Sequence, residues 1–329
     1  MELIEVITNI LRKAQANVYR SLNQEMVQAY WQIGKRIVEE EQNGKARATY
    51  GKGLIKSLSA PLQAEFGKGF SVANLENMRR FYLTYPISQT VSMKLQIPDF
   101  QLSWSHYQLL IRIENAEERQ FYELEAIQNA WSLRELKRQY DSALYLRLAL
   151  SKDKEGVKKL AIEGQIIEKS QDLVKDPYIL EFLALPIQHR YSESNLENEL
   201  IDKLEYFLLE LGKGYTFVAR QKRISFDERH FYIDLVFYNR LLRCFVLIDL
   251  KIGDLKHQDL GQMQMYVNYY DRFVKLAEEN KTIGIILCQD KSEMLVEITL
   301  PEENEQIFAS RYQTVLPSKE ELQRLLMEK

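Results

Sequence analysis

Two apolar runs separated by a short polar stretch, FYIDLVFYNRLLRCFVLIDLKI at residues 231–252, constrain the fold more than any other part of the sequence. Both runs are rich in β-branched and aromatic residues, a composition typical of strands. They predict strands over 231–238 and 243–252, and the four residues 239–242 predict the loop of a hairpin between them. The second half of the chain therefore contains a β-sheet.

The sequence around this hairpin alternates between helical and strand patterns. Apolar residues at helical spacing predict an amphipathic helix over 196–211, which Gly212 and Gly214 end. The run TIGIILC at 282–288 is apolar throughout and predicts a buried strand. The further predicted elements are a strand at 215–221, a helix at 258–277, a strand near 312–315 and a helix that begins with the capping box Ser318-x-x-Glu321. We expect residues 177–329 to form an α/β domain with a mixed sheet.

The first 150 residues contain helical patterns only. Apolar residues recur three or four positions apart from Ile7 to Ile37, which predicts a helix over 1–43 that Gly44 ends. A helix at 54–66, the turn Gly67-Lys68-Gly69 and a helix at 72–84 capped by Ser71 then follow in the order of a helix-turn-helix. Further helices are expected over 105–113, 117–128 and 132–150. We expect an all-α domain over 1–150 and an α+β protein overall.

A charged connector and a basic stretch complete the organisation. Of the 26 residues 151–176, 12 are charged and none is aromatic, which predicts a partly helical connector. The net charge is −3, yet residues 45–94 contain eight basic and two acidic residues. Such a stretch indicates a phosphate-rich partner, although an ordinary solvated surface is the alternative. The apolar stripe of the first helix has two uses, as one face of a domain core or as the seam of a homodimer.

Composition excludes several classes of protein. Two cysteines and four histidines provide neither a disulfide framework nor an evident zinc site. The N-terminal residues MELIEVITNILRK carry acids where a signal peptide has a basic region. No run approaches the ~20 apolar residues of a membrane span. We expect a cytoplasmic protein with no membrane partner.

Asp234, Asp249 and Lys251 are the residues that most strongly indicate chemistry, because each interrupts an apolar strand. Asp249 and Lys251 project from the same face of their strand, which has a period of two. A four-residue loop over 239–242 places Asp234 opposite Leu247, one step from Asp249. Neighbouring carboxylates repel one another unless a cation holds them, and oxygen ligands suit Mg²⁺ or Mn²⁺. A structural ion pair between Asp249 and Lys251 is the alternative.

Two helices contribute further candidates. Glu197 lies within the apolar stripe of the helix at 196–211, either because it points into the site or because it reaches solvent at the edge of the stripe. Gln262 and Tyr266 are four residues apart and share one face of the next helix. That face could contact a phosphate or hold Lys251, or it could be the polar edge of a core helix.

These residues resemble the PD-(D/E)xK nuclease superfamily, and Gln262-x-x-x-Tyr266 resembles the Q-x-x-x-Y motif of its RecB-like branch. The segments YGKGLIKSLSAPLQAEFGKGFSVANLENMRRFYLTYP, WSLRELKRQYDSALYLRL, FYIDLVFYNRLLRCFVLIDLKIG and GQMQMYVNYYDR follow the order of the YhcG-type bacterial proteins. The resemblance implies a helical or winged-helix N-terminal module and a restriction-endonuclease-like C-terminal domain. It implies a Mg²⁺-dependent DNA phosphodiesterase with Asp234 and Asp249 as metal ligands, Lys251 as the catalytic lysine, Glu197 as the helix-one glutamate and Gln262 as the motif glutamine.

The sequence departs from the family pattern at two places. Asp249 stands where the family usually has glutamate, one methylene longer. The capped helix begins Ser71-Val72-Ala73 where relatives are expected to carry arginines, so Asn77 and Arg80 become the better DNA-binding candidates. Arg79 and Lys68 are the other DNA-binding candidates. The expected function is a metal-dependent nuclease of duplex or branched DNA, and the alternative is a non-catalytic DNA-binding adaptor whose N-terminal half mediates dimerisation.

Overall fold

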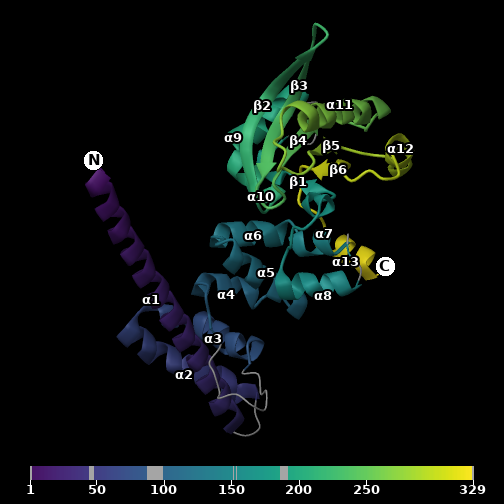
Figure 1. The fold of residues 1–329 in the computed structure, drawn as a ribbon. Helices are drawn as coiled ribbons and strands as arrows, with labels where there is room; N and C mark the ends of the chain where they lie inside the picture. Colours follow the sequence, from purple (N-terminus) through teal and green to yellow (C-terminus); the bar gives the residue numbers. More distant parts are fainter. Residues whose placement is uncertain are drawn as a thin grey trace. The chain divides into compact units, whose positions relative to one another are not determined.

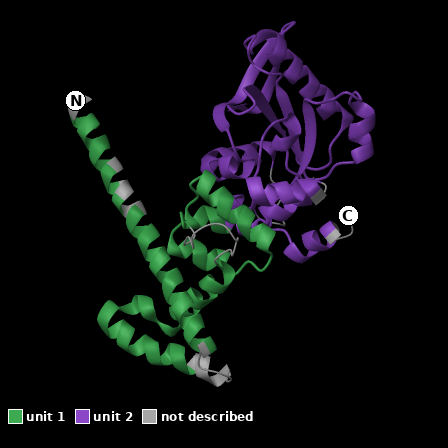
Figure 2. Ribbon diagram, turned by 60° about the horizontal axis from the view of Figure 1, so that its bottom comes forward, with its two compact units in different colours: residues 1–137 green, residues 138–329 purple. Residues whose placement is uncertain are grey.

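A computed structural model describes residues 2–43, 48–86, 99–150, 152, 154–185 and 192–327. The chain forms two compact units, residues 1–137 and 138–329 (Figure 2). The first unit is helical in its described part, and the second contains a six-stranded sheet with flanking helices, so the protein is α+β as predicted (Figure 1). The predicted helix end at Gly44 and most of the loop between Pro86 and Pro98 lie outside the described residues.

In its described ranges, the first unit contains five α-helices and the beginning of a sixth. Ser71 caps α3 by accepting a hydrogen bond from the backbone N–H of Asn74. The predicted start of the second helix at Leu54 is wrong: α2 begins at Ala48, because two glycines lower helix propensity without forbidding a helix. The bounds are α1 Glu2–Asn43, α2 Ala48–Phe66, a 3₁₀ turn at Lys68–Phe70, α3 Val72–Thr84, α4 Trp104–Leu110, α5 Ala116–Gln128 and α6 Leu133–Asp141.

Only the second half of the α1 stripe enters the core of this unit. Val27 and Trp31 are buried, and Trp31 donates its indole N–H to the carbonyl of Tyr85 after α3. Gly34 lies so close to the backbone of Met78 that any side chain at this position would collide with α3. The large apolar side chains that the structure describes in the first half are exposed, namely Ile4, Val6, Ile7, Ile10, Leu11, Val18 and Leu22. A domain core therefore explains the stripe only from Val27 onward.

The second unit contains a mixed sheet with the strand order β1-β6-β5-β4-β3-β2. The strands β2, β3 and β4 are antiparallel neighbours, whereas β4, β5, β6 and β1 are parallel. The strands have the bounds β1 Tyr178–Ile179, β2 Tyr215–Phe226, β3 Arg229–Asn239, β4 Cys244–Leu250, β5 Ile283–Cys288 and β6 Ile307–Gln313. The predicted strand at 215–221 is thus longer, and the one predicted near 312–315 begins earlier.

The predicted register of the central hairpin is wrong. The turn lies one residue further along the chain than predicted, so Leu247 is opposite Val236 and not opposite Asp234. Asn239 pairs with Cys244, so the turn comprises residues 240–243. Arg243 has a left-handed backbone with φ 49° and belongs to the turn, while the Asn239 side chain accepts hydrogen bonds from the backbone N–H groups of Leu241 and Leu242. Leu235 consequently pairs with Ile248, and the ladder continues towards Asp234 and Asp249.

Helices cover both faces of the sheet. The core on one face includes Leu196, Leu200 and Phe207 of α9 and α10, and the other includes Leu260, Met263 and Tyr266 of α11. The helix bounds are α7 Leu144–Leu150, α8 Lys154–Glu163, α9 Glu193–Asp202, α10 Leu204–Leu211, α11 His257–Phe273, α12 Glu293–Thr299 and α13 Lys319–Met327. The single helices predicted over 132–150 and 196–211 are each two helices, because Ala143 is left-handed and Lys203 leaves the helical region.

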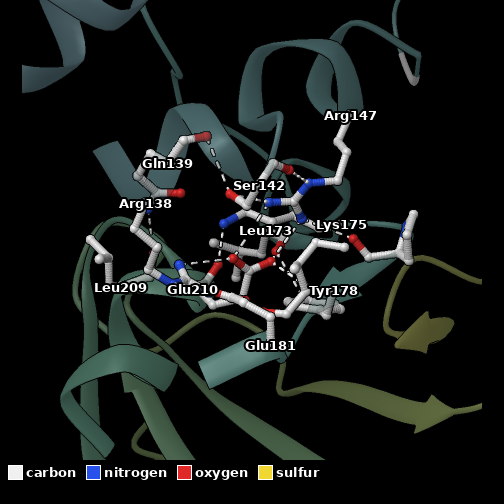
Figure 3. Close-up of polar contacts among 12 residues, drawn as sticks. Arg138, Gln139, Ser142, Arg147, Leu173, Lys175, Tyr178, Glu181, Leu209 and Glu210 are labelled. Carbon is white, nitrogen blue, oxygen red and sulfur yellow. Dashed lines mark hydrogen bonds and ion pairs between the residues drawn. The ribbon is translucent and has the colours of Figure 1, made fainter. Parts of the chain in front are cut away.

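A buried ionic network around Glu210 joins α7 and α10 to β1 (Figure 3). Arg147 Nη1 lies 2.7 Å from Glu210 Oε1, and Arg138 Nη1 lies 3.3 Å from Oε2. Lys175 donates to the backbone carbonyl of Glu210, and the backbone N–H of Ile179 donates to its carboxylate. Burial raises the pKa of Glu210, but the attraction of these cations lowers it by more, and the resulting pKa is about 2. The carboxylate therefore stays ionised in the interior.

Both cysteines lie inside the sheet. Cys244 begins β4 and Cys288 ends β5, and both are buried and free. Burial raises the pKa of Cys244 to about 12 and that of Cys288 to about 11. No helix in the described part of the chain combines the length and apolar character that crossing a membrane requires.

Candidate active site

The candidate site residues on the strands, Asp234, Asp249 and Lys251, lie just beyond the last paired residues of β3 and β4, Leu235 and Ile248. The backbone N–H of Leu250 donates to Asp234 Oδ2 over 2.8 Å, which fixes the Asp234 carboxylate against β4. Asp249 is 2% exposed at the end of β4. Lys251 Nζ lies 2.7 Å from Asp249 Oδ2 in an ion pair whose direction is not that of a hydrogen bond. Asp234, Asp249 and Lys251 thus form one cluster.

The electrostatics of this cluster are those of carboxylates crowded in a poorly solvated place. Burial, and then repulsion by Asp234, raise the pKa of Asp249 to about 7 against the attraction of Lys251. Burial also raises the pKa of Asp234. Burial lowers the pKa of Lys251, but the attraction of Asp249 and Glu193 outweighs it and leaves that pKa above its ordinary value. Perturbed pKa values within one cluster are characteristic of functional sites.

Glu197 reaches the cluster through a residue that sequence reasoning missed. The amide of Gln221 on β2 donates to Glu197 Oε2 over 2.5 Å and to Asp234 Oδ1 over 3.0 Å. Gln221 is left-handed with φ 44°, which is unusual within a strand. Arg220 Nε lies 3.2 Å from Glu197 Oε1. Glu197 is 5% exposed, and burial raises its pKa, so its position in the apolar stripe is that of a buried acid whose carboxylate contacts β2.

Gln262 and Tyr266 lie together on α11 and face β3. Gln262 donates to the Tyr266 hydroxyl over 2.5 Å, and that hydroxyl donates to the carbonyl of Tyr232 over 2.8 Å. These hydrogen bonds connect α11 to β3 rather than to Lys251. The pKa of Tyr266 is raised by burial and, to a smaller degree, by Asp249 and Asp234, which places the hydroxyl beside the acidic cluster.

The acids present fit a hard divalent cation in part. Asp249 Oδ2 and Glu197 Oε1 are buried oxygens whose charged neighbours, Lys251 and Arg220 respectively, lie at ion-pair distance without the direction of a hydrogen bond, so both oxygens keep a lone pair that a metal could use. Within the described ranges, no three or more His, Cys, Asp or Glu residues are already grouped as a metal site. Asp234 and Asp249 therefore form the core of the candidate site, and Glu197 would join it after exchanging its contacts with Gln221 and Arg220.

The N-terminal DNA-binding candidates differ in their availability. Arg80 on α3 and Lys68 before it are exposed, and Asn77 is half-buried. Arg79 is engaged by Glu41 of α1, with Nε 2.7 Å from Oε2. Arg79 therefore holds α3 against α1, which leaves Arg80 as the freest cation of this helix surface.

A mixed sheet with one acid on β3, an Asp-x-Lys at the end of β4 and a glutamate on a preceding helix matches the arrangement that the resemblance to the PDDEXK nucleases implies. Residues 171–327 match the YhcG PDDEXK nuclease domain, and residues 6–147 match the DUF1016 N-terminal domain. The protein named "Putative nuclease YhcG" from Escherichia coli (strain K12) is 38% identical over 96% of this chain and 90% of its own length. The chain belongs to the YhcG family of nucleases.

Solved structures offer weaker similarities. A repair endonuclease from Pyrococcus abyssi is 18% identical over 40% of this chain, with a TM-score of 0.27. The EndoMS protein in an EndoMS–dsDNA2 complex is 14% identical over 41% of this chain, with a TM-score of 0.28. The chain covers about half the length of each of these proteins, 50% and 51% respectively.

Proposed function

We propose that the protein is a divalent-metal-dependent nuclease that hydrolyses phosphodiester bonds of duplex or branched DNA in the bacterial cytoplasm. The observation that carries the proposal is the cluster of Asp234, Asp249 and Lys251, in which two carboxylates and an ammonium group meet at the end of β4. Oxygen-only ligands favour Mg²⁺ or Mn²⁺ over zinc. Membership of a nuclease family supports the same reaction class.

The side chains have distinct roles in this proposal. Asp234 and Asp249 would hold the cation, and Glu197 would complete its protein ligands. A bound Mg²⁺ or Mn²⁺ would polarise the phosphate and make a bound water more acidic. The ammonium of Lys251, kept protonated by Asp249, presents positive charge to the phosphate on which negative charge develops. Gln262 and Tyr266 position β3 through the carbonyl of Tyr232.

The N-terminal unit supplies further DNA affinity in this proposal. Exposed Arg80 and Lys68 are suited to phosphate contacts, and Asn77 lies on the same helix as Arg80. Arg79 contributes less because Glu41 engages it. The exposed first half of α1 favours self-association of this unit, and a homodimer would place two nuclease units on one DNA molecule.

The test is cleavage by the purified full-length chain and its Lys251→Ala variant. Linear, nicked, four-way-junction and single-stranded DNA are incubated with Mg²⁺, with Mn²⁺ and with EDTA. We expect metal-dependent cleavage by the parent, no cleavage by the Lys251→Ala variant and parental cleavage by the control Lys281→Ala, which removes an exposed lysine before β5. DNA binding without cleavage under every metal condition would instead favour the non-catalytic DNA-binding protein.

A further inference from the structure

The outer part of the β2–β3 hairpin extends beyond the rest of the sheet (Figure 1). The strand β3 pairs with β4 only from Leu235 to Asn239, whereas its pairing with β2 continues to Arg229. We call residues 222–233 of this two-stranded extension the arm. A two-stranded ribbon is marginally stable by itself, and the arm is held because Ile224 and Ile233 are buried in the core beside α11.

The arm carries an ordered polar cluster on exposed residues. Arg223 Nε donates to Ser225 Oγ over 3.1 Å, and Arg223 Nη2 lies 3.3 Å from His230 Nε2. Ser225 Oγ lies 2.9 Å from His230 Nδ1, which closes a three-residue ring of contacts. Because arginine only donates, we assign His230 Nε2 as the acceptor and Nδ1–H as the donor to Ser225.

This assignment leaves donors available to a ligand. Ser225 Oγ accepts from both Arg223 and His230, so its own O–H has no acceptor among the residues that the structure describes. Arg223 is itself exposed, so its other guanidinium N–H groups are accessible to solvent. Lys222 and Arg229 are also exposed, at positions that alternate with those of the cluster, and the only acids of the arm, Asp227 and Glu228, lie in the turn at its tip. The flank of the arm is a preorganised set of anion-binding groups.

The cluster is aligned with the active site. His230, Tyr232 and Asp234 occupy every second position of β3, the spacing that places side chains on one side of a strand. At about 3.3 Å per residue, His230 is roughly 13 Å from Asp234 along β3. That distance corresponds to about four base-pair steps of a DNA strand. Tyr232 pairs with Arg223 across the arm, is 47% exposed and lies between the cluster and the carboxylate.

We propose that Arg223, Ser225 and His230 bind the backbone of the DNA substrate on one side of the phosphate that is cleaved, with Tyr232 packing against the same strand. The planar guanidinium, the free hydroxyl and their fixed mutual geometry suit a phosphate oxygen. An exposed aromatic ring between two phosphate-binding points suits a sugar or base face. The inference rests on the proposed function, and it gives the nuclease unit its own DNA-contact surface.

The experiment measures DNA binding by the full-length chain in EDTA, so that cleavage does not interfere. Fluorescence anisotropy with a labelled duplex and a labelled four-way junction is recorded at several salt concentrations. We expect Arg223→Ala to weaken binding about tenfold at low salt and to reduce the salt slope by about one. The matched control is Arg240→Ala, an exposed arginine in the β3–β4 turn at the other end of the same strand, which should bind as the parent does.

A second variant separates DNA contact from bracing of the arm. Ser225→Asp places a negative charge between Arg223 and His230, which keeps both partners of the cluster paired but repels phosphate. We expect this variant to melt at the parental temperature and to lose more affinity than Arg223→Ala.

Parental affinity and salt slope in both folded variants would overturn the inference and leave the proposed nuclease intact. A parent chain that binds through the arm but never cleaves would contradict only the nuclease proposal. A parent chain that binds neither the duplex nor the four-way junction would overturn both the inference and the proposed function.

Discussion

Replacing Glu210 with glutamine removes the charge at the centre of the buried network while preserving size. Arg147 then remains in the interior without the carboxylate that it pairs with, whereas Arg138 keeps its ion pair with Glu181. Removing one partner of a buried ion pair typically costs 3–5 kcal/mol, because the remaining charge stays desolvated. The pKa gives an independent value: a change from 4.5 to about 2 corresponds to about 3 kcal/mol at ~1.4 kcal/mol per pH unit. We expect Glu210→Gln to lower the free energy of unfolding by about 3–5 kcal/mol at pH 7.

The effect has a defined pH dependence. The pKa of Glu210 in the folded protein lies below its ordinary value, so the ionised carboxylate stabilises the fold above about pH 4.5. This contribution is lost as the pH falls from about 4.5 towards 2. The difference between the parent and Glu210→Gln should therefore be full at pH 7 and should shrink at pH 3.

Urea unfolding provides the assay, and the chain supplies two probes. All three tryptophans, Trp31, Trp104 and Trp131, lie in residues 1–137, so their fluorescence follows the first unit, whereas circular dichroism follows both units. With a slope of about 2 kcal/mol/M, the transition of the second unit should move by roughly 1.5–2.5 M. The control Glu205→Gln changes an exposed acid of α10 and should shift stability by less than about 0.5 kcal/mol. An unchanged dichroism midpoint in Glu210→Gln at pH 7 would refute the reasoning.

Three further predictions concern the site and the first unit. Asp249→Asn should abolish cleavage and, in metal-free buffer, raise Tm by about 4–8 °C at pH 8 but little at pH 4. Burial and Asp234 raise the pKa of Asp249 to about 7, so the cost of its charge to the folded state grows as the pH rises towards that value. An equal gain in Tm at both pH values would contradict this. Gln221→Gly should lower the Mg²⁺ concentration for half-maximal cleavage several-fold, because it removes the amide that binds the oxygens of Glu197 and Asp234 in the parent. Glycine tolerates the backbone φ of 44° at this position. A higher Mg²⁺ requirement would count against this prediction. Arg80→Ala should weaken binding to unrelated duplexes equally and reduce the salt slope by about one, and sequence-dependent losses would speak against a phosphate contact.

Local sequence patterns predicted the elements that carry the site. The apolar runs around Asp234 and Asp249 are long enough to identify two strands, and the period of two then places Asp249 and Lys251 on one face. The same patterns could not give the register, because it depends on the left-handed backbone of Arg243 and on two hydrogen bonds accepted by the Asn239 side chain. Such turn geometry leaves no trace in hydrophobic periodicity.

Long-range polar contacts were beyond the reach of sequence reasoning. Gln221 lies 24 residues from Glu197 and 13 from Asp234, and glutamine in an exposed strand segment is unremarkable by itself. Glu210 is separated by 63 residues from Arg147 and by 72 from Arg138, and it lies in a helix whose pattern gives no reason for a buried acid. Only the assembled fold shows that these charges are desolvated together, so their effect on stability could not be predicted.

Because Cys244 and Cys288 are buried, their rate of modification by a thiol reagent reports how often the sheet of the second unit opens. Thiol reagents attack the thiolate, and pKa values of about 12 and 11 leave almost none at pH 8, even before burial blocks the approach of the reagent. Modification therefore waits for β4 and β5 to open, and its rate measures how often the strand that carries Asp249 separates from its neighbours. Since the chain has no other cysteine, one placed on the arm would be the single fast-reacting thiol, ready for a fluorophore or a cross-linker to DNA while both native cysteines remain in place.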